Sequence, residues 1–266
     1  MVDTPTVSAS EALVLPSLPN FRDLGGLPTR DGRRLQHRKV FRSSAFDRAS
    51  QDDLQRLADA GLSLVCDLRS PQESQAAPNH WVAGHAPLGL NMGIMTDLRA
   101  MQGGLRQYLR THPDMHGMRQ GMLDVYSNMP AGFAPALPVM INHILDDEKL
   151  PVAIHCHAGK DRTGFMCAVL LHALGVHPDD IMADYLISAE KVDPPQLLLD
   201  LMEILEDVGI PNDLELVGPA IFVEPDYLHR ALAVVQRDHG GLDRYLESVG
   251  GLTPARRERL QERLLA

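Results

Sequence analysis

The sequence predicts an α/β fold in which a short, mostly parallel sheet is flanked by helices, and three observations lead to this prediction. Residues 50–61 (SQDDLQRLADAG) have the apolar spacing of a helix, and an apolar run typical of a buried strand follows over residues 62–68. A second apolar strand over residues 150–154 (LPVAI) leads through a tight loop into an apolar helix over residues 163–174. Helical patterns fill the remaining C-terminal part. Strands that alternate with helices favour a parallel sheet covered on both faces.

Local signals justify the other elements in chain order. An Asp-Gly turn at residues 31–32, between two short strand-like pieces, predicts a hairpin within residues 24–44. Ser50 is expected to cap the first helix and Gly61 to end it. Residues 71–104 show weak periodicity and many Gly, Met and Pro, so we expect loops near the site. Further helices are expected over residues 105–112, 115–129, 135–146, 178–191, 194–208, 225–239, 242–249 and 253–265.

Length and composition fit one domain over residues 1–266, with residues 1–14 as a flexible N-terminal arm. The formal net charge of −10 argues against a nucleic-acid partner, so any basic surface is expected to be local. No apolar run reaches the roughly 18 residues of a transmembrane helix. The N-terminus lacks the basic and apolar regions of a signal peptide. Three cysteines suit a reducing compartment, so we expect a cytoplasmic protein, with secretion by a route without a cleavable signal left open. The sequence does not indicate an oligomeric state.

The loop over residues 155–164 (HCHAGKDRTG) is the most informative stretch. A strand, a tight loop and a helix N-terminus gather backbone N–H groups around one anion. Cys156 stands at the start of this loop and Arg162 at its end, separated by five residues. The pattern therefore indicates a nucleophile aimed at a bound phosphate.

Each residue type in the loop suits attack on phosphorus. We expect Cys156 to be a thiolate at neutral pH, because amides, a helix N-terminus and Arg162 surround it. Arg162 offers a planar fork to two phosphoryl oxygens, and the match improves in the transition state. Thr163 can donate its hydroxyl to the departing sulfur, and His155 is expected to brace the loop through a buried hydrogen bond. The residues expected to contact the phosphate or the rest of the substrate are His157, Ala158, Gly159, Lys160, Thr163 and Gly164.

Each of these features also has an ordinary interpretation. A lone buried cysteine is usually a small hydrophobic residue, and a cysteine separated from an arginine by five residues often arises by chance. Here Gly159, the Thr-Gly pair after Arg162, the apolar strand before the loop and the apolar helix after it all agree. The sequence therefore favours Cys156 and Arg162 as catalytic residues.

The loop resembles the HC-x5-R signature of cysteine-dependent phosphatases. Its HCxAGKDRTG form is similar to the bacterial tyrosine and dual-specificity phosphatases related to the secreted mycobacterial protein-tyrosine phosphatase B. Further similar blocks are residues 20–26 (NFRDLGG), 41–44 (FRSS), 65–70 (VCDLRS) with Glu73, 225–228 (PDYL) and 251–253 (GLT). The resemblance covers about residues 15–265. It implies a protein-tyrosine-phosphatase-like fold with additional C-terminal helices. It also implies hydrolysis of phosphotyrosine through a phosphocysteine intermediate, with phosphoserine, phosphothreonine and phosphoinositides as further candidate substrates.

The proton donor for the leaving group is less clearly marked. The only tryptophan is followed by Val-Ala-Gly, so the Trp-Pro-Asp loop of many superfamily members is absent. In the bacterial family an aspartate with a proposed catalytic role matches Asp161, which is the first candidate. Asp67 is the rival, because it ends a strand expected beside the loop strand. Asp67 can equally form a salt bridge to Arg69 or Arg42, and Asp97 is a third candidate.

Lys160, in the middle of the loop, has two interpretations. It is either a solvated surface lysine or a cation that pairs with a second phosphate on the substrate. The second interpretation suits phosphoinositides better than phosphotyrosine. The sequence identifies no aromatic wall for a phosphotyrosine slot, so it does not rank the two substrates.

Two other classes of protein remain open. A sulfur transferase of the rhodanese type also uses a loop cysteine, but the five-residue spacing and the Arg-Thr-Gly at the helix start argue against it. A non-catalytic phosphate-binding module would normally have lost the cysteine, the arginine or the acid. The twelve histidines are scattered, and His155 and His157 would point apart on a strand-like turn, so we expect no metal and no cofactor.

Two further hypotheses concern access and redox control. Residues 194–208 have apolar residues at helical spacing, so they form either a core helix or part of a helical lid over residues 193–212. The lid resembles that of the mycobacterial relative. Cys66 ends a strand expected beside the loop strand, and it is either a buried strand residue or a redox partner of Cys156. The second interpretation rests on a resemblance to a human tumour-suppressor lipid phosphatase, in which a cysteine at a comparable strand end pairs with the nucleophile.

Overall fold

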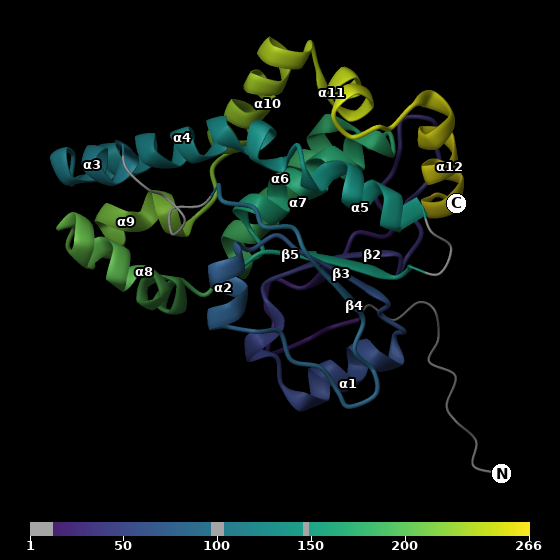
Figure 1. Cartoon of the computed structure of the whole chain (residues 1–266), viewed down its shortest axis with the longest axis horizontal. Coiled ribbons are helices and arrows are strands. Elements are labelled where there is room, and N and C mark those ends of the chain that lie inside the picture. Colours follow the sequence, from purple (N-terminus) through teal and green to yellow (C-terminus); the bar gives the residue numbers. More distant parts are fainter. Residues whose placement is uncertain (1–12, 97–103, 146–148) are drawn as a thin grey trace.

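The structure is a computed structural model, and it describes residues 13–96, 104–145 and 149–266 (Figure 1). The described residues form a five-stranded sheet in the order β1-β2-β5-β3-β4. The strands are β1 (Arg22–Asp23), β2 (Val40–Ser43), β3 (Leu64–Asp67), β4 (Leu88–Asn91) and β5 (Val152–His155). β1 is antiparallel to β2, and every other neighbouring pair is parallel. The predicted α/β class with a mostly parallel sheet is confirmed.

Helices cover both faces of the sheet. In Figure 1, α1 lies on one face, and α5, α6 and the C-terminal helices lie on the other. The α-helices are α1 (Gln51–Asp59), α2 (Pro71–Ala76), α3 (Gly104–Thr111), α4 (Met115–Phe133), α5 (Ala136–Leu145), α6 (Asp161–Ala173), α7 (Pro178–Lys191), α8 (Pro194–Val208), α9 (Leu214–Ile221), α10 (Pro225–His239), α11 (Leu242–Ser248) and α12 (Pro254–Leu264), and a 3-10 helix, η1, spans Phe46–Arg48.

The buried apolar residues form two clusters, one on each face of the sheet. On β5, Val152 and Ile154 belong to the larger cluster, whereas Ala153 between them belongs to the smaller one. On β3, Cys66 belongs to the larger cluster and Val65 to the smaller. Successive side chains of a strand point to opposite faces. Both strands therefore read as unbroken apolar runs because both of their faces are buried.

Residues 71–104, which were expected to contribute loops near the site, also contain a helix and a strand. These are α2 and β4, and residues 97–103, Asp97 among them, lie outside the described residues. No residue of α2 is buried, so it has no apolar periodicity to detect. β4 is a mostly exposed edge strand whose conformation depends on its pairing with β3. α9 was not expected either, because Gly218 and Pro219 interrupt its pattern. α4 also continues through Pro130 to Phe133.

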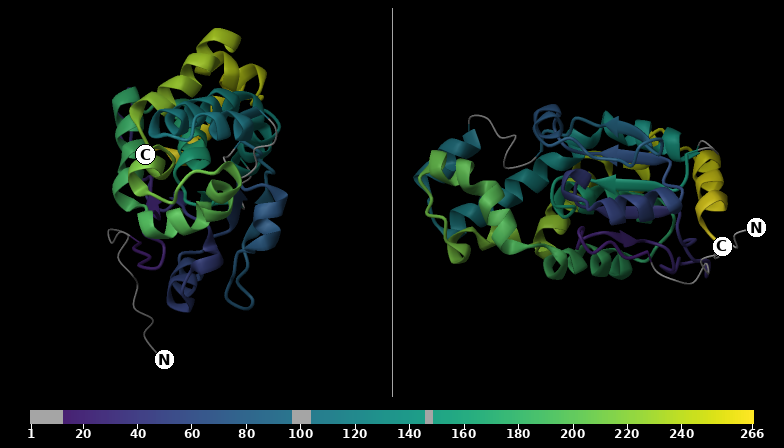
Figure 2. Two further views of the ribbon diagram at one scale, coloured as in Figure 1. Left: turned by 90° about the vertical axis from the view of Figure 1, so that its left-hand side faces the viewer. Right: turned by 90° about the horizontal axis from the view of Figure 1, so that it is seen from below.

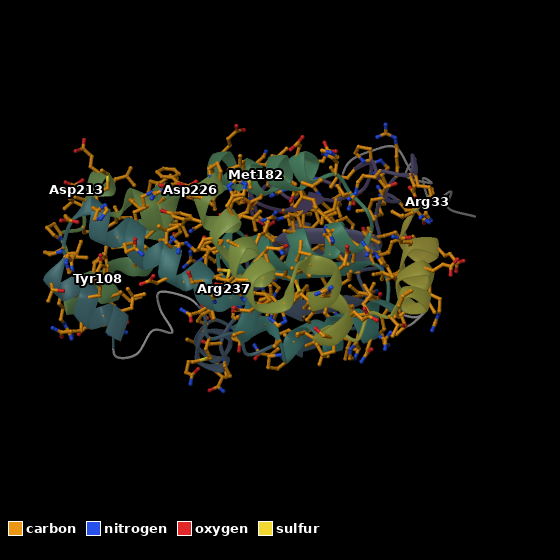
Figure 3. The ribbon with its side chains drawn as sticks, turned by 90° about the horizontal axis from the view of Figure 1, so that it is seen from above. Arg33, Tyr108, Met182, Asp213, Asp226 and Arg237 are labelled. Atoms are coloured by element: carbon orange, nitrogen blue, oxygen red, sulfur yellow. The ribbon has the colours of Figure 1, made fainter. Side chains whose placement is uncertain are left out.

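The helices α3, α8 and α9 lie beyond one end of the sheet (Figure 1). Figure 2 shows α8 and α9 at the end opposite α12. In Figure 3, Tyr108 on α3 and Asp213 before α9 mark this end, and Arg33 marks the other. Arg106 and Arg110 of α3 both pair with Asp207 of α8, at 2.5 and 3.0 Å. The helix α8 is thus tied to α3 beyond this end of the sheet. None of the described helices is long and apolar enough to cross a membrane.

Of the arm expected over residues 1–14, only Leu13 and Val14 are described. Leu13 packs against the smaller apolar cluster, and Val14 is 62% exposed. The chain therefore already contacts the domain at Leu13.

Candidate active site

The candidate active site lies where β5 leaves the sheet. β5 runs between β2 and β3, and the register places His155 beside Ser43 on one side and beside Asp67 on the other. The three strands therefore end at the same edge, where ligands bind in open α/β sheets. The loop over residues 156–160 starts at this edge and leads directly into α6.

Groups outside the loop hold four consecutive loop carbonyls, those of residues 156–159. In chain order, the donors are Nδ1 of His155 at 2.8 Å, the N–H of Ala45 at 2.9 Å, Nδ2 of Asn20 at 2.8 Å and Nη2 of Arg42 at 2.9 Å. These donors come from β5, η1's N-cap, the segment before β1, and β2. The orientation of four successive peptide units is therefore fixed from outside the loop.

This arrangement also fixes the loop N–H groups. A trans peptide unit places the C=O of one residue and the N–H of the next on opposite sides. Because the carbonyls of residues 156–159 face their donors, the N–H groups of residues 157–160 face away from them. Among the described residues, none of these four N–H groups donates to a protein acceptor. Together with the N-terminus of α6, they form an arrangement suited to an anion.

Arg42 belongs to a buried ionic network behind the loop. Its side chain is fully buried, and Nη1 donates to Oδ2 of Asp184 on α7 at 2.5 Å. Arg22 donates to the other carboxylate oxygen at 2.7 Å. Burial would raise the pKa of Asp184, but Arg42 and Arg22 outweigh it and hold this pKa below its usual range. α7 is thus linked through two charges to the carbonyl of Gly159.

Arg162, at the start of α6, is fully buried and held by Glu73. Its Nη1 and Nη2 atoms donate to the two carboxylate oxygens of Glu73 at 2.7 and 2.8 Å. Glu73 itself forms a capping box with Ser70 at the N-terminus of α2. A guanidinium carries five N–H groups, and this ion pair uses two of them in a fixed plane. Glu73 therefore sets the orientation of Arg162 relative to the loop.

Asp161 and Lys160 lie together at the N-terminus of α6. Nζ of Lys160 is 2.6 Å from Oδ2 of Asp161, and the two side chains are 5% and 13% exposed. The hydroxyl of Tyr126 on α4 donates to Oδ1 of Asp161 at 2.8 Å. Lys160 is therefore a buried, paired cation in this structure and not a solvated one.

Asp67, the rival acid, is bound to Arg69. Nη2 of Arg69 lies 2.7 Å from Oδ2 of Asp67, and Nε donates to Oδ1 at 2.9 Å. Burial would raise the pKa of Asp67, but Arg69 outweighs it, so this pKa lies below its usual range. A carboxyl group held in this way is a poor proton donor at neutral pH. The structure therefore gives Asp67 a structural salt bridge.

His155 is a buried brace between β5 and the segment after α2. A carbonyl oxygen only accepts, so Nδ1, 2.8 Å from the carbonyl of Cys156, carries the ring proton. Nε2 then accepts from Nδ2 of Asn79 at 3.0 Å. Burial lowers the pKa of His155, which keeps the ring neutral at pH 7.

Thr163 and Gly164 occupy the first turn of α6. The hydroxyl of Thr163 is buried and has no hydrogen-bond partner among the described residues, so the expected donation to the Cys156 sulfur is not made in this state. A Cβ on Gly164 would lie 2.7 Å from a ring carbon of Tyr185. Gly164 therefore packs closely against Tyr185 of α7, in addition to its place at the start of α6 beside the loop.

The three cysteines are all buried and free. Cys66 lies beside Ile154 in the register, two residues before Cys156. Burial raises the pKa of Cys66 and of Cys167 to about 12 in each case. Neither of these two thiols is appreciably ionised at neutral pH.

The helix α8 reaches the loop through Asp200. Oδ2 of Asp200 lies 2.6 Å from Nε2 of His157, and Oδ1 accepts from Nη2 of Arg48 at 2.8 Å. Burial would raise the pKa of Asp200, but His157 and Arg48 outweigh it and lower this pKa. A cavity of about 190 Å³ lies between α8 and the loop, and His157, Ala158, Leu197 and Asp200 contribute to its wall.

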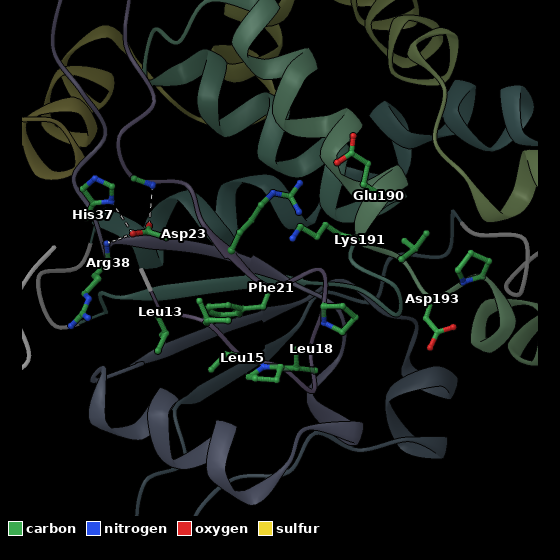
Figure 4. Close-up of a pocket in the computed structure, with 17 residues that line it drawn as sticks. Leu13, Leu15, Leu18, Phe21, Asp23, His37, Arg38, Glu190, Lys191 and Asp193 are labelled. Carbon is green, nitrogen blue, oxygen red and sulfur yellow. Dashed lines mark hydrogen bonds and ion pairs between the residues drawn. The ribbon is translucent and has the colours of Figure 1, made fainter. Parts of the chain in front are cut away.

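A larger pocket of about 970 Å³ adjoins this cavity (Figure 4). Leu15, Leu18 and Phe21 form part of its apolar wall, and Asp23 and Lys191 are among its polar residues. No residue of the loop lines it within the part of the chain that the structure describes. The described residues also contain no group of three or more His, Cys, Asp or Glu side chains that could hold a metal ion.

Sequence comparison agrees with the class of protein that this fold and loop define. The chain belongs to the tyrosine phosphatase family, whose sequence model matches residues 13–266, and it is a phosphatase. A Cupriavidus necator protein named among the tyrosine-protein phosphatases is 32% identical over 247 residues, which cover 91% of this chain and 85% of the relative. The triple specificity protein phosphatase PtpB of Mycobacterium tuberculosis is 28% identical over 269 residues, covering 89% of this chain and 93% of PtpB. The family resemblance expected from the sequence is confirmed.

The residues that support the loop were not identified as site residues from the sequence. Asn20, Arg42 and Glu73 lie in blocks that resemble the family, but no local pattern indicates which loop atoms they contact. Asp184 and Tyr126 lie in ordinary amphipathic helices, and no sequence pattern marks either of them as a site residue. The Ser-x-x-Glu spacing before α2 is a detectable capping-box pattern, which could have located Glu73 on a helix.

Proposed function

We propose that this phosphatase hydrolyses phosphate monoesters, with phosphotyrosine as the first candidate substrate, through a phosphocysteine intermediate. Cys156 attacks phosphorus in line with the leaving oxygen, while the loop N–H groups and Arg162 hold the three equatorial oxygens. Asp161 donates a proton to the leaving oxygen. Asp161 then accepts a proton from the water that hydrolyses the phosphocysteine.

The orientation of the loop N–H groups carries this proposal. Four consecutive carbonyls face outside donors, so four N–H groups face the other side, beside Cys156 and the start of α6. Fixed donors of this kind stabilise charge that develops on the phosphoryl oxygens without reorganising. Arg162, held in plane by Glu73 at the start of α6, is expected to add a positive charge beside these oxygens.

A substrate panel tests the substrate class. Phosphotyrosine, phosphoserine and phosphothreonine peptides and phosphoinositide vesicles should be compared by kcat/KM on one enzyme preparation. Vanadate should inhibit all turnover, because its trigonal form resembles the transition state. Persulfide formation from thiosulfate without phosphatase activity would instead support the sulfur-transferase alternative. The words "triple specificity" in the name of PtpB are a reason to test more than one class of substrate.

Asp161→Asn is expected to slow poor leaving groups much more than good ones. General acid catalysis contributes roughly 10²- to 10⁴-fold, so turnover of phenyl phosphate should fall by about that range. Turnover of 2,4-dinitrophenyl phosphate should change little, because its leaving group departs without a proton. Asp67→Asn is the matched control and should not change the ratio of the two rates. If Asp161→Asn lowers the turnover of both substrates equally, Asp161 is not the general acid and another residue has that role.

The phosphoinositide proposal depends on Lys160. In this structure its ammonium group is bound to Asp161, so a second substrate phosphate would compete with that carboxylate. Lys160→Met should therefore reduce kcat/KM on phosphoinositides more than on phosphotyrosine peptides. The substrate panel above measures this difference.

We also propose that α8 is a lid. Its inner face is buried through Leu197, Leu201 and Leu205, whereas Leu199 on the outer side is 59% exposed. Cys156, next to His157 in the loop that α8 contacts, is only 3% exposed. Asp200 is the polar link that connects α8 to the catalytic loop. Opening would separate Asp200 from His157 and Arg48 and admit large substrates to the loop.

Asp200→Asn is expected to favour opening. A hydrogen bond to a charged group contributes about 1.5–3 kcal/mol, so the open population should rise roughly tenfold or more. The kcat/KM on a phosphopeptide should then rise several-fold more than that on phenyl phosphate. Asp207→Asn, which releases α8 only from α3, is the matched control. Since the pKa of Asp200 is lowered, its carboxylate is ionised at neutral pH, and its ion pair with Arg48 weakens only in strong acid.

Cys66 is the proposed redox partner of Cys156. Peroxide would oxidise the Cys156 thiolate to a sulfenic acid, and the Cys66 thiol would displace water to form a disulfide. After peroxide and then reductant, the wild type should recover activity and Cys66→Ser should recover much less. Cys167→Ser, which removes another buried thiol with a raised pKa, is the control. Equal recovery in all three proteins would show that Cys66 is a packing residue.

A further inference from the structure

The two oxygens of Asp161 have different partners. Oδ2 faces the Lys160 ammonium at 2.6 Å, and Oδ1 accepts a hydrogen bond from the Tyr126 hydroxyl at 2.8 Å. Lys160 is the adjacent residue, but Tyr126 lies 35 residues away, on the buried side of α4. Tyr126 is fully buried, so its hydroxyl is not exchanged for water at this position.

A second tyrosine fixes the direction of this hydrogen bond. The hydroxyls of Tyr126 and Tyr185 are 2.7 Å apart. Tyr126 has one proton and gives it to Asp161, so Tyr185 donates to the oxygen of Tyr126. Burial and the nearby charge of Asp161 raise the pKa of both phenols well above its ordinary value. Both tyrosines therefore remain protonated, and the chain Tyr185–Tyr126–Asp161 ends on the carboxylate.

Such a chain orients the carboxyl group without supplying a proton. One oxygen, Oδ1, is held by a phenol that is itself fixed in the core. Oδ2 pairs with Lys160 in this state, so it can carry the proton to the leaving oxygen only after the substrate phosphate has drawn the ammonium group away from it. Proton transfer requires heavy atoms within about 2.6–3.2 Å of each other, and small misplacements of a catalytic group reduce the rate strongly.

We infer that Tyr126 is a positioning residue for catalysis, and that it holds the Asp161 carboxyl so that Oδ2 faces the leaving oxygen of the substrate. This inference rests on the proposed role of Asp161 as the general acid. Tyr185 supports Tyr126 from α7, the same helix whose Asp184 holds Arg42 behind the loop. The helix α7 thus connects to the C-terminal end of the catalytic loop at two positions, Gly159 through Arg42 and Asp161 through Tyr126.

The hydroxyl of Tyr126 can be removed with little change to the packing. Its ring stacks on Tyr227 with centroids 5.4 Å apart and meets Tyr185 edge-on at 6.4 Å. Its hydroxyl contacts only Asp161 and Tyr185 among the described residues. Tyr126→Phe keeps both ring contacts and deletes both hydrogen bonds. Tyr227→Phe is a matched control, because it deletes a hydroxyl of the same aromatic cluster that donates to the carbonyl of Pro219.

The test compares two substrates on each variant. Phenyl phosphate releases a phenol with a pKa of about 10, and 2,4-dinitrophenyl phosphate releases an anion that needs no proton. We expect Tyr126→Phe to lower kcat on phenyl phosphate roughly tenfold, a part of the whole general-acid effect, and to change kcat on the dinitrophenyl ester less than twofold. Tyr227→Phe should leave the ratio of the two rates unchanged. The ratio does not depend on the folded fraction, because both rates come from one preparation.

A double variant separates positioning from other effects. In the Asp161→Asn background, Tyr126→Phe should cause no further loss on phenyl phosphate. If Asp161→Asn changes the ratio of the two rates and Tyr126→Phe does not, then Tyr126 does not position Asp161. Asp161 would still be the proposed general acid. If Tyr126→Phe lowers both rates equally, its role is structural and the inference is overturned. If Asp161→Asn itself leaves the ratio unchanged, the proposed acid is wrong, and the inference falls with it.

Discussion

Cys156→Ser is expected to abolish turnover while substrate binding is retained. Serine has nearly the same size as cysteine, so the loop carbonyls keep their outside donors and the N–H groups keep their direction. A serine hydroxyl lacks the nucleophilicity of a thiolate, and losing a covalent nucleophile costs roughly 10⁴-fold or more. Binding should persist because Arg162 and the loop N–H groups hold the phosphate independently of the sulfur. The measurements are kcat on a phosphotyrosine peptide and the Kd of the same peptide by calorimetry.

The control for this variant is Cys167→Ser, which removes another buried thiol from the same strand–loop–helix unit. It should retain kcat, since Cys167 lies on α6 beyond the loop. Turnover by Cys156→Ser, in a preparation free of wild-type enzyme, would exclude the phosphocysteine mechanism. Loss of both turnover and binding would mean that the substitution distorts the loop, and the peptide Kd distinguishes this case.

The sequence predicts those elements of the fold whose signal is local. β3 and β5 are recognisable because both of their faces are buried, and α6 because its apolar sequence starts at the loop. β4 could not be found in this way, because its exposed side chains carry no pattern and its conformation depends on pairing with β3. The six-residue helix α2 depends on its caps alone. Elements stabilised by contacts distant in the sequence are therefore the ones that sequence patterns miss.

The same distinction applies to the candidate site. Cys156, Asp161 and Arg162 were proposed from one loop of consecutive residues, where spacing alone is informative. The groups that hold the loop come from far along the chain: Asn20 lies 138 residues from the carbonyl that it binds. Such contacts follow from the order of strands in the sheet. That order places β2 beside β5 although much of the chain separates them.

The support of the loop leads to a second large effect, at Gly159. Its φ is +72°, in the left-handed region that residues with a Cβ adopt at a cost of about 1–2 kcal/mol. A Cβ there would also lie 2.3 Å from the carbonyl oxygen of Ser43 and 2.7 Å from the backbone nitrogen of Ser44. These are backbone atoms at the end of β2, so they cannot rotate away. Gly159→Ala must therefore push the loop from β2 and break the hydrogen bond from Arg42 to the Gly159 carbonyl.

We expect Gly159→Ala to lower kcat/KM by roughly 100-fold or more, because misplaced loop N–H groups no longer match the phosphoryl oxygens. Gly61→Ala is the matched control: Gly61 has a φ of +73°, but a Cβ there would meet nothing within 4 Å. The Gly61→Ala control therefore has the backbone strain without the steric clash. It should lose about 1 kcal/mol of stability and keep full activity. Thermal unfolding and vanadate inhibition should be measured on both variants. If Gly159→Ala keeps its affinity for vanadate, the direction of the loop N–H groups does not depend on the contact with β2, and the anion site proposed here is held by something else.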